Sequence, residues 1–429
     1  MERTASDEQR NADAACPMHT PLQVARDGAG AALPPRSVVF IHSDAYFRAL
    51  AQLPVHPRRE QMTLALLLGL AREHADCNET NTKEEKGRGL FGMQVIAPSL
   101  ATEEQLMRFH ARDYIETLRR TETESSDADK AADTQAAQLR HQAFELVDDA
   151  YVFPGLYEYC RSVAGASMTA ADALRHLMGR QARLAPVAIN LGGGRHHAMR
   201  SQASGFCYVN DVVLAIQRLL SPPISPAMPR VDRVLCIDID VHHGDGVQEA
   251  FYFSPTVTTI SFHLREPAFF PGTGGQDEIG KGRGKYHSIN VPLQRGVTDE
   301  NFTTLFDKVV SAAVRCVEPQ VLVLVCGVDT LARDMLGGFN MTNSGIATCV
   351  KKLMSFNLPL LLLGGGGYSG SDACRALAAA VLSVVAPSLD LDNCEVPEHD
   401  YYEEYVHITV MTLASNGDST GVDMVLASA

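Results

Sequence analysis

The chain has 429 residues, of which 45% are hydrophobic and 21% charged, an ordinary composition for a globular protein of one to three domains. Its mean hydropathy is near zero and no apolar run could span a bilayer, while its net charge of −14 comes without the basic stripe that wrapping DNA requires. We therefore expect no membrane insertion and no direct nucleic-acid binding, and the N-terminus shows no secretion signal.

The first third of the chain mixes predicted elements with polar segments. Residues 1–36 are rich in Ala, Pro and polar residues and predict a disordered extension. Residues 37–42 predict a strand and residues 60–74 a helix. The polar stretch 75–90 predicts a loop.

A capping-box pattern marks the next helix. Thr102 and Gln105 have the spacing at which each side chain satisfies the backbone of the other, which predicts a helix as far as about Arg119. Residues 121–138 lack an apolar period and predict an exposed polar insertion.

From residue 185 onward, short apolar runs alternate with helical stretches such as 300–317 and 344–355. The strand-like runs are 185–190, 233–239, 257–262, 288–293, 321–326 and 358–364. Short, almost wholly apolar strands separated by helices predict a mainly parallel sheet covered by helices on both faces. We expect a single large α/β domain over residues 37–412 and a C-terminal tail over 413–429, with the functional site at the carboxyl ends of the strands.

Polar residues stand where the apolar strands end. Asp238, Asp240 and His242 alternate along one strand end, so their side chains face the same way. Asp329 ends another apolar strand. Buried carboxylates are costly unless they are paired or bind a metal, and two carboxylates with one imidazole suit a catalytic zinc ion that keeps an open position. The alternative is that the Asp-x-Asp-x-His pattern is a salt-bridged loop.

Two adjacent histidines, His196 and His197, follow another strand on a Gly-rich turn. Their spacing is poor for joint metal ligation, so general acid–base work beside a metal is the better interpretation. Each histidine would need a partner to set its tautomer, and Asp238 and Asp245 are available. The alternative is a structural pair of histidines on a turn.

Tyr368 follows a run of four glycines. Glycines let the backbone approach a ligand closely, and a phenol there could donate a hydrogen bond to a developing oxyanion. A competing interpretation is dinucleotide binding, because Gly365, Gly367 and Gly370 match G-x-G-x-x-G and Asp390 lies about twenty residues on. However, little α/β sequence follows to complete such a unit.

Six sequence blocks resemble the signature blocks of the histone deacetylase family, in the same order. They are GGGRHHAMRSQASGFCYVND, DIDVHHGDGVQEAF, FFPGTG, GVDTLARD, GGFNMT and LLLGGGGY. The match spans about residues 37–410 and implies the arginase/deacetylase fold. The HHGDG block resembles class I, and Tyr368 in place of His argues against class IIa.

The resemblance implies a zinc-dependent amide hydrolase that releases acetate from N6-acetyl-lysine in histones or other proteins. His197 would be the main general base and acid, backed by Asp245. His196 would be its electrostatic partner, backed by Asp238, and Tyr368 would polarise the acetyl carbonyl.

The same resemblance implies two metal sites. Asp240, His242 and Asp329 would bind one zinc ion. Potassium would bind beside the zinc, partly through backbone carbonyls, at Asp238, Asp240, His242, Ser261 and Phe262.

The remaining implied residues contact the substrate. The lysine tunnel and its rim would be formed by Gly205, Phe206, Phe270, Leu336 and Gly366. Loop aromatics such as Phe206 and Phe270 are often only loop anchors, but two opposed rings would make a slot for an alkyl chain. Asp149, or Asp148 beside it, would hold the substrate backbone. Arg59 would lie at the foot of the pocket.

Three positions depart from the family pattern. Arg195 stands where relatives usually carry an aromatic residue before the histidine pair, and Phe40 and His42 replace usual Tyr positions in the first strand. All three are expected near the foot pocket, and a buried Arg195 would need a partner.

The expected partners are acetylated histone tails or other acetyl-lysine proteins, and corepressor-type proteins, with a role in chromatin and transcription regulation. Residence in the nucleus, the cytoplasm or both is expected from the family alone. Two alternatives stay open: a deacetylase of small acetylated amines such as polyamines, and an inactive scaffold that docks partners.

Overall fold

The computed structural model of the protein describes residues 36–77, 90–124, 134–180, 182–405 and 411. Nearly all of the predicted N-terminal extension and the whole C-terminal tail 413–429 lie outside these residues, as do most of the 75–90 loop and the middle of the 121–138 insertion.

In the part of the chain that the structure describes, eight strands form one sheet, and every neighbouring pair is parallel. The order across the sheet is β2-β1-β3-β8-β7-β4-β5-β6. The strands are β1 (Val38–Ile41), β2 (Gln94–Ile96), β3 (Val187–Asn190), β4 (Val234–Asp238), β5 (Val257–Leu264), β6 (Ser288–Leu293), β7 (Val321–Val325) and β8 (Leu360–Leu363). The predicted α/β class with a parallel sheet is confirmed.

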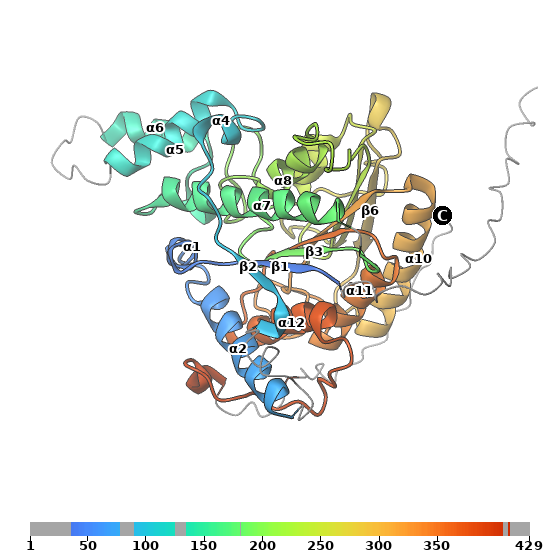
Figure 1. Ribbon diagram of the computed structural model, residues 1–429. Coiled ribbons are helices and arrows are strands. Elements are labelled where there is room, and N and C mark those ends of the chain that lie inside the picture. Colours follow the sequence, from blue (N-terminus) through green and yellow to red (C-terminus); the bar gives the residue numbers. More distant parts are fainter. Residues whose placement is uncertain (1–35, 78–89, 125–133, 181, 406–410, 412–429) are drawn as a thin grey trace, which may run out of the picture. The chain divides into compact units, whose positions relative to one another are not determined.

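Helices cover both faces of the sheet (Figure 1). One layer consists of α2 (Arg59–Cys77), α10 (Asp299–Val317), α11 (Asn343–Ser355) and α12 (Gly370–Val385). The opposite layer includes α1 (Asp44–Leu50), α4 (Glu103–Leu106), α5 (Arg112–Glu124), α7 (Leu156–Met178), α8 (Asp211–Leu220) and α9 (Asp245–Phe251). A further helix, α6 (Thr134–Ala143), follows α5. Among the described helices, none combines the length and apolarity that crossing a membrane requires.

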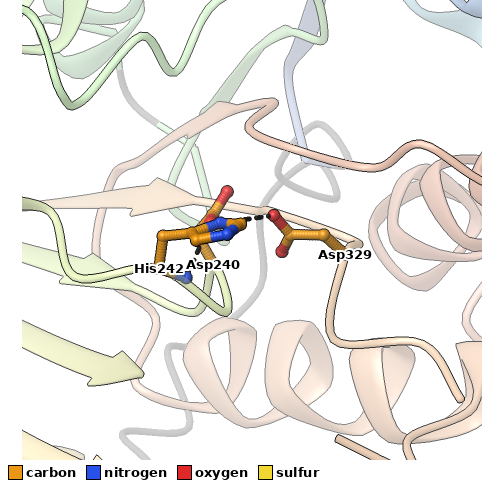
Figure 2. Close-up of side chains that lie close together, drawn as sticks. All are labelled: Asp240, His242 and Asp329. Carbon is orange, nitrogen blue, oxygen red and sulfur yellow. Dashed lines mark hydrogen bonds and ion pairs between the residues drawn. The ribbon is translucent and has the colours of Figure 1, made fainter. Parts of the chain in front are cut away.

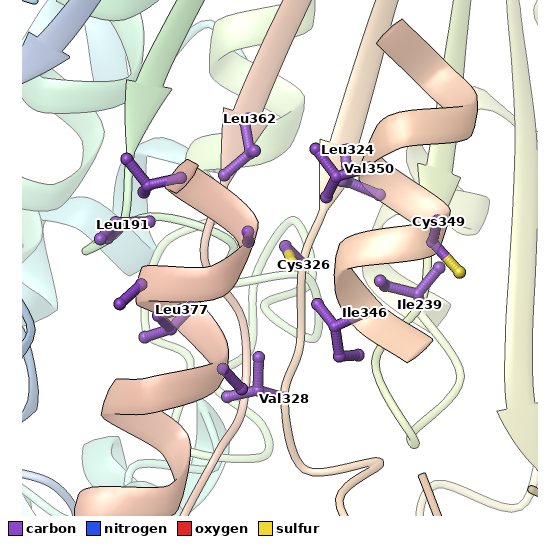
Figure 3. Close-up of a cluster of buried hydrophobic side chains, with 14 of the residues drawn as sticks. Leu191, Ile239, Leu324, Cys326, Val328, Ile346, Cys349, Val350, Leu362 and Leu377 are labelled. Carbon is purple, nitrogen blue, oxygen red and sulfur yellow. The ribbon is translucent and has the colours of Figure 1, made fainter. Parts of the chain in front are cut away.

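The central strands are buried because alternate side chains fill two separate hydrophobic cores. On β7 and β8, Leu324 and Leu362 face the layer of α11 and α12 (Figure 3), whereas Val323 and Leu361 face the layer of α7 and α8. A strand that is apolar on both faces has no solvated side, which explains the near-continuous apolar runs in the sequence. Because all strands are parallel, their carboxyl ends meet at one edge of the sheet.

Two local predictions need correction. The capping box of Thr102 and Gln105 is present, but it begins the short helix α4, and a separate helix, α5, starts at Arg112. The predicted insertion is helical at both ends, since α5 continues to Glu124 and α6 begins at Thr134. Thr121, inside the predicted exposed segment, is buried and its hydroxyl donates to a backbone carbonyl one turn earlier.

Candidate active site

Three ligand-type side chains meet where two neighbouring strands end (Figure 2). Asp240 and His242 follow β4, Asp329 follows β7, and β4 and β7 are paired in the sheet. The Nδ1 atom of His242 lies 3.1 Å from Oδ1 of Asp240 and 3.1 Å from Oδ2 of Asp329. All three side chains are buried, and one possible ligand atom from each lies within 4.8 Å of the others. The structure thus brings the three predicted metal ligands together.

Charge and spacing both fit a divalent cation in this cluster. Burial and the negative charge of the neighbouring Asp240 raise the pKa of Asp329 to about 7. Two negative charges so close together repel each other. Burial lowers the pKa of His242, but the two carboxylates outweigh burial and raise that pKa to about 10. The cluster therefore favours a positive charge at its centre. Ligands around a tetrahedral zinc ion lie about 3.3 Å apart, close to the 3.1 Å separations of His242 from each carboxylate.

Backbone amides orient both carboxylates of the cluster. Oδ1 of Asp329 accepts from the N–H of Val241 at 2.8 Å, and Oδ2 of Asp240 accepts from the N–H of Gly366 at 2.7 Å. A β-carbon on residue 366 would lie 2.1 Å from Oδ2 of Asp329. Only glycine allows this close approach of the backbone to the carboxylates.

The same contacts exclude the dinucleotide interpretation of the glycine pattern at 365–370. Such a site needs free backbone N–H groups for a pyrophosphate, but the amide of Gly366 already donates to Asp240. Among the described residues, no strand follows α12, so Asp390 does not end a second βαβ unit. The glycine run therefore belongs to the Asp/His cluster.

Each of the two adjacent histidines is held by its own carboxylate. Nδ1 of His196 lies 2.6 Å from Oδ2 of Asp238, and Nδ1 of His197 lies 2.7 Å from Oδ1 of Asp245. Their ring centroids are 3.9 Å apart, and all four side chains are buried. A carboxylate on Nδ1 sets the tautomer so that Nε2 is the atom available for chemistry.

The surroundings push the pKa values of the two histidines in opposite directions. Burial lowers the pKa of His196, but Asp238 and Asp240 outweigh it and raise the value to about 9. Burial and the positive charge on His196 lower the pKa of His197 to about 4. The ring of His196 is therefore charged and the ring of His197 is neutral at pH 7. Two neighbouring groups with pKa values pushed apart in this way can take different roles in acid–base catalysis.

A buried carboxylate that was not predicted from the sequence fixes the turn before these histidines. Asp211, the first residue of α8, accepts from the N–H of Gly194 at 3.0 Å and from the N–H of Arg195 at 2.7 Å. Asn210, which caps α8, donates from Nδ2 to the carbonyl of His196 at 3.3 Å. In the sequence, the Asn-Asp pair stands directly before an apolar helical run, a pattern that marks the start of a helix.

Tyr368 lies beyond the glycine run, next to the aromatic ring of Phe206. The two ring centroids are 5.8 Å apart. The backbone N–H of Tyr368 donates to Oδ2 of Asp334 at 2.7 Å, a second anchoring carboxylate that was not predicted from the sequence. Burial, then the charges of Asp329 and Asp240, raise the pKa of the phenol well above its usual value. The hydroxyl therefore stays protonated and can act as a hydrogen-bond donor.

Residues 40–385 match the histone deacetylase domain model. The chain belongs to the histone deacetylase family. It is 41% identical to histone deacetylase 19 of Arabidopsis thaliana, over 82% of this chain and 62% of that protein. It is 43% identical to histone deacetylase 2 of rice, Oryza sativa subsp. japonica, over 82% of this chain and 61% of that protein. It is 39% identical to human histone deacetylase 1, over 82% of this chain and 64% of that protein.

The chain spans about three-fifths of the length of these curated relatives. The class I-like resemblance of the signature blocks is confirmed by these matches.

In this histone deacetylase domain, two of the predicted tunnel residues, Phe270 and Gly205, lie against the ring of His197. The ring of Phe270 lies 4.8 Å from that of His197, edge to face. A β-carbon on Gly205 would lie 2.6 Å from the His197 ring and 3.0 Å from the Phe270 ring. Phe270 and Leu336 are each 38% exposed, so both reach the surface as rim residues would.

The predicted rim aspartate is hydrogen-bonded to a residue of the predicted tunnel. Oδ2 of Asp149 accepts from the N–H of Gly205 at 3.1 Å. Asp148 and Asp149 line a cavity of about 340 Å³ together with Phe270. Both acidic candidates thus lie beside Phe270, and Asp149 is also hydrogen-bonded to Gly205, a predicted tunnel residue.

At the foot of the predicted substrate pocket, Arg59 is buried, and all three nitrogens of its guanidinium group donate hydrogen bonds. It donates to the carbonyls of Gly365 and Gly367 at 3.0 and 3.4 Å and to Oε1 of Glu60 at 2.9 Å. Arg195 is also buried, and its Nη1 lies 3.4 Å from Nε2 of His56.

That Phe40 and His42 lie near the foot pocket stays a prediction. Phe40 is completely buried in the core beneath α2. His42 follows β1 and lines a separate cavity of about 350 Å³ with Asp44 and Phe47.

The predicted potassium site stays a prediction. Asp238 and Ser261 are paired across β4 and β5, and the Ser261 hydroxyl is hydrogen-bonded to the His263 ring at 2.9 Å. The Phe262 side chain packs against Phe302, so only its carbonyl could face an ion.

Proposed function

We propose that this chain hydrolyses the acetamide of N6-acetyl-lysine in proteins in a zinc-dependent reaction that releases acetate. The observation that carries the proposal is the pair of adjacent, buried histidines beside the Asp240, His242 and Asp329 cluster. Each histidine is hydrogen-bonded to a separate carboxylate. Nε2 of His196 also lies 3.7 Å from Oδ1 of Asp240, one of the three predicted metal ligands.

Asp240, His242 and Asp329 would hold the metal, which when bound supplies a Lewis acid for the acetyl carbonyl and acidifies water. His197 is the general base: with Nδ1–H donated to Asp245, its Nε2 takes a proton from the attacking water. The same nitrogen then passes this proton to the lysine nitrogen as the amide bond breaks.

His196 contributes a fixed positive charge, because Asp238 and Asp240 stabilise its protonated form. Tyr368 donates its phenolic proton in a hydrogen bond to the carbonyl oxygen, where negative charge develops. Phe206 and Phe270 flank this centre and would exclude water from the alkyl chain of the lysine.

Replacement of Tyr368 by phenylalanine tests the proposal. Tyr368→Phe should lower kcat by about 10²–10³, the usual effect of removing one oxyanion donor, while zinc content stays equal to wild type. Tyr286→Phe, on a tyrosine that is 69% exposed, is the matched control and should leave kcat unchanged. Near-normal turnover by Tyr368→Phe would refute this role.

We propose acetylated histone tails or other acetyl-lysine proteins as substrates. The acidic side chains of Asp148 and Asp149 beside the tunnel support a substrate that carries positive charge next to the acetyl-lysine. Rates on an acetyl-lysine peptide and on an acetylpolyamine, measured side by side, separate this proposal from small-amine deacetylation. Potassium binding, corepressor-type partners and nuclear or cytoplasmic residence stay predictions from the family resemblance.

A further inference from the structure

Two aromatic rings of one loop lie against two histidines of the site. The ring of Phe269 is stacked on that of His242 at 5.2 Å, and the ring of Phe270 lies 4.8 Å from that of His197. The two rings thus form an aromatic wall beside the site. Residues 265–275, which carry them, form neither a helix nor a strand. The position of the wall therefore depends on the groups that hold this loop.

A single carboxylate binds the end of the loop. Oε1 of Glu278 accepts from the backbone N–H of Gly274 at 2.9 Å and from that of Gly275 at 2.8 Å. On the other side of the same turn, the carbonyl of Gly274 accepts from Nε2 of His263 at 3.0 Å. Both backbone groups of residue 274 are therefore held by side chains, and Glu278 holds the amide of residue 275 as well.

The second oxygen of this carboxylate is bonded to the side-chain amide of Gln248. Gln248 lies in α9, and its Nε2 donates to Oε2 of Glu278 at 2.7 Å. Its Oε1 accepts from the hydroxyl of Ser288 at 2.8 Å and from Nδ2 of Asn290 at 2.7 Å. The same oxygen lies 3.2 Å from Nε2 of His243. These groups fix the orientation of the amide, so that its N–H faces Glu278.

Helix α9 also carries the carboxylate behind the proposed general base. The helix begins at Asp245, whose Oδ1 lies 2.7 Å from Nδ1 of His197. Gln248 follows one turn later on the same helix. The bond between Gln248 and Glu278 therefore links the helix that orients His197 to the loop that carries Phe270.

We propose that Glu278, bonded to Gln248, is a positioning residue for the substrate tunnel, because it fixes the aromatic wall relative to α9. The inference rests on the proposed deacetylase function, in which the alkyl chain of acetyl-lysine lies against Phe270. Glu278 acts through the loop. The wall would contact the alkyl chain in the bound substrate and in the transition state alike, so a displaced wall should raise KM rather than lower kcat.

Glu278→Gln tests the proposal without a change in side-chain size. Its amide oxygen can still accept from the two backbone N–H groups of the loop, but its NH₂ group then faces the NH₂ group of Gln248, and two donors cannot bond. Gln248 cannot turn over without losing its bonds to β6. We expect KM for an acetyl-lysine peptide to rise about tenfold or more, with kcat within about twofold of wild type. Zinc content should be unchanged.

Exchange of the two side chains provides the rescue. In the double variant Gln248→Glu with Glu278→Gln, the amide at position 278 donates to the carboxylate at position 248, which still accepts from β6. This variant should return KM to within about threefold of wild type. Gln248→Glu alone should raise KM, because two carboxylates then face each other. Glu249→Gln, on an exposed carboxylate of the same helix, is the matched control and should leave KM unchanged.

Hydrogen exchange of the full chain gives a readout that needs no turnover. Glu278→Ala removes the acceptor of the Gly274 and Gly275 amides, so peptides that cover residues 269–275 should exchange about tenfold faster, while peptides from β4 stay unchanged. Unchanged exchange in Glu278→Ala would overturn the proposal. A double variant with a KM no lower than that of Glu278→Gln would do the same, as would a fall in kcat at constant KM.

Failure of the proposed function would give a different result. A wild-type chain that hydrolyses no acetyl-lysine peptide would refute deacetylation and with it the role of Glu278 in substrate binding. The exchange rates of residues 269–275 would still decide whether Glu278 holds the loop.

Discussion

Asp245→Asn separates two roles of the carboxylate behind His197: fixing the ring and stabilising its charged form. Oδ1 of Asp245 accepts from Nδ1 of His197 at 2.7 Å and from the N–H of Gly246 at 2.9 Å. Because Gly246 can donate only to an oxygen, the side-chain amide of asparagine should keep its oxygen at this position. The ring and its tautomer should therefore be preserved, and only the negative charge should be lost.

The expected magnitude follows from the hydrogen bond. A bond to a charged group contributes about 1.5–3 kcal/mol and a neutral bond about 0.5–1.5 kcal/mol, so the difference is about 1.4 kcal/mol, or tenfold in rate. Asp245→Ala, which removes the bond altogether, should cost about 10²–10⁴-fold, the contribution of a positioned general base.

The pH dependence has a defined sign. Asp245 raises the pKa of His197, which burial and His196 otherwise lower, to a final value of about 4. The base is active when neutral, above its pKa. Asp245→Asn lowers this pKa further, so the acid limb of the kcat/KM profile should move to lower pH or disappear.

The assay is kcat/KM on an acetyl-lysine peptide from pH 4 to 9, with zinc content and thermal unfolding measured on the same samples. Asp307→Asn, on an exposed carboxylate of α10, is the matched control. If Asp245→Asn lost as much activity as Asp245→Ala, the carboxylate would act by selecting the tautomer, and the reasoning from Gly246 would be refuted.

Three further substitutions test the supporting structure. Gly366→Ala should abolish metal binding, measured by zinc content, because a β-carbon would lie 2.1 Å from Oδ2 of Asp329; normal zinc content would contradict the packing. Asp211→Asn should lower the free energy of unfolding by about 1–3 kcal/mol in urea, since the amide can accept from only one side and leaves a buried N–H unpaired. Burial lowers the pKa of His110 to about 4 from 6.5, and its Nε2 accepts from the N–H of Asn210 at 3.0 Å, so stability is lost as pH falls from about 6.5 to about 4. His110→Gln should reduce this loss by up to about 3 kcal/mol, and an unchanged pH slope of urea stability would show that His110 is not its source.

The fold class could be predicted because the central strands are apolar on both faces. The runs that became β4, β7 and β8 have no solvated side chain and therefore no polar alternation, which distinguishes a covered parallel sheet from other β structures. The short edge strand β2 could not be predicted, since its three residues are half-exposed or exposed and have no pattern. Pairing with β1 forms this strand.

The broken helix after Thr102 shows tertiary contacts outweighing a local signal. The capping box favoured one helix to about Arg119, yet the chain leaves the helix after Leu106. Phe109 is buried, and the ring of His110 accepts the backbone N–H of Asn210, a residue 100 positions away. A contact at that separation leaves no periodic trace in the local sequence.

In the site, the residues that could be predicted were those whose chemistry is visible in the sequence. Asp240, His242 and Asp329 follow apolar strands and are buried. A buried charged group is costly unless it is paired or binds a metal, so such residues stand out in the sequence. The Asn-Asp pair marks Asp211 only as the start of a helix, and nothing marks Asp334, because the groups that these carboxylates anchor are backbone amides. Every residue except proline has a backbone N–H, so such a partner cannot be recognised from the sequence.

Locating the metal tests the account most directly. X-ray diffraction data collected on both sides of the zinc absorption edge, from crystals of the full chain, would give the position of any zinc ion. We expect one anomalous peak about 2.0–2.2 Å from ligand atoms of Asp240, His242 and Asp329. Zinc bound elsewhere, with no peak at these three side chains, would contradict the proposed hydrolytic site.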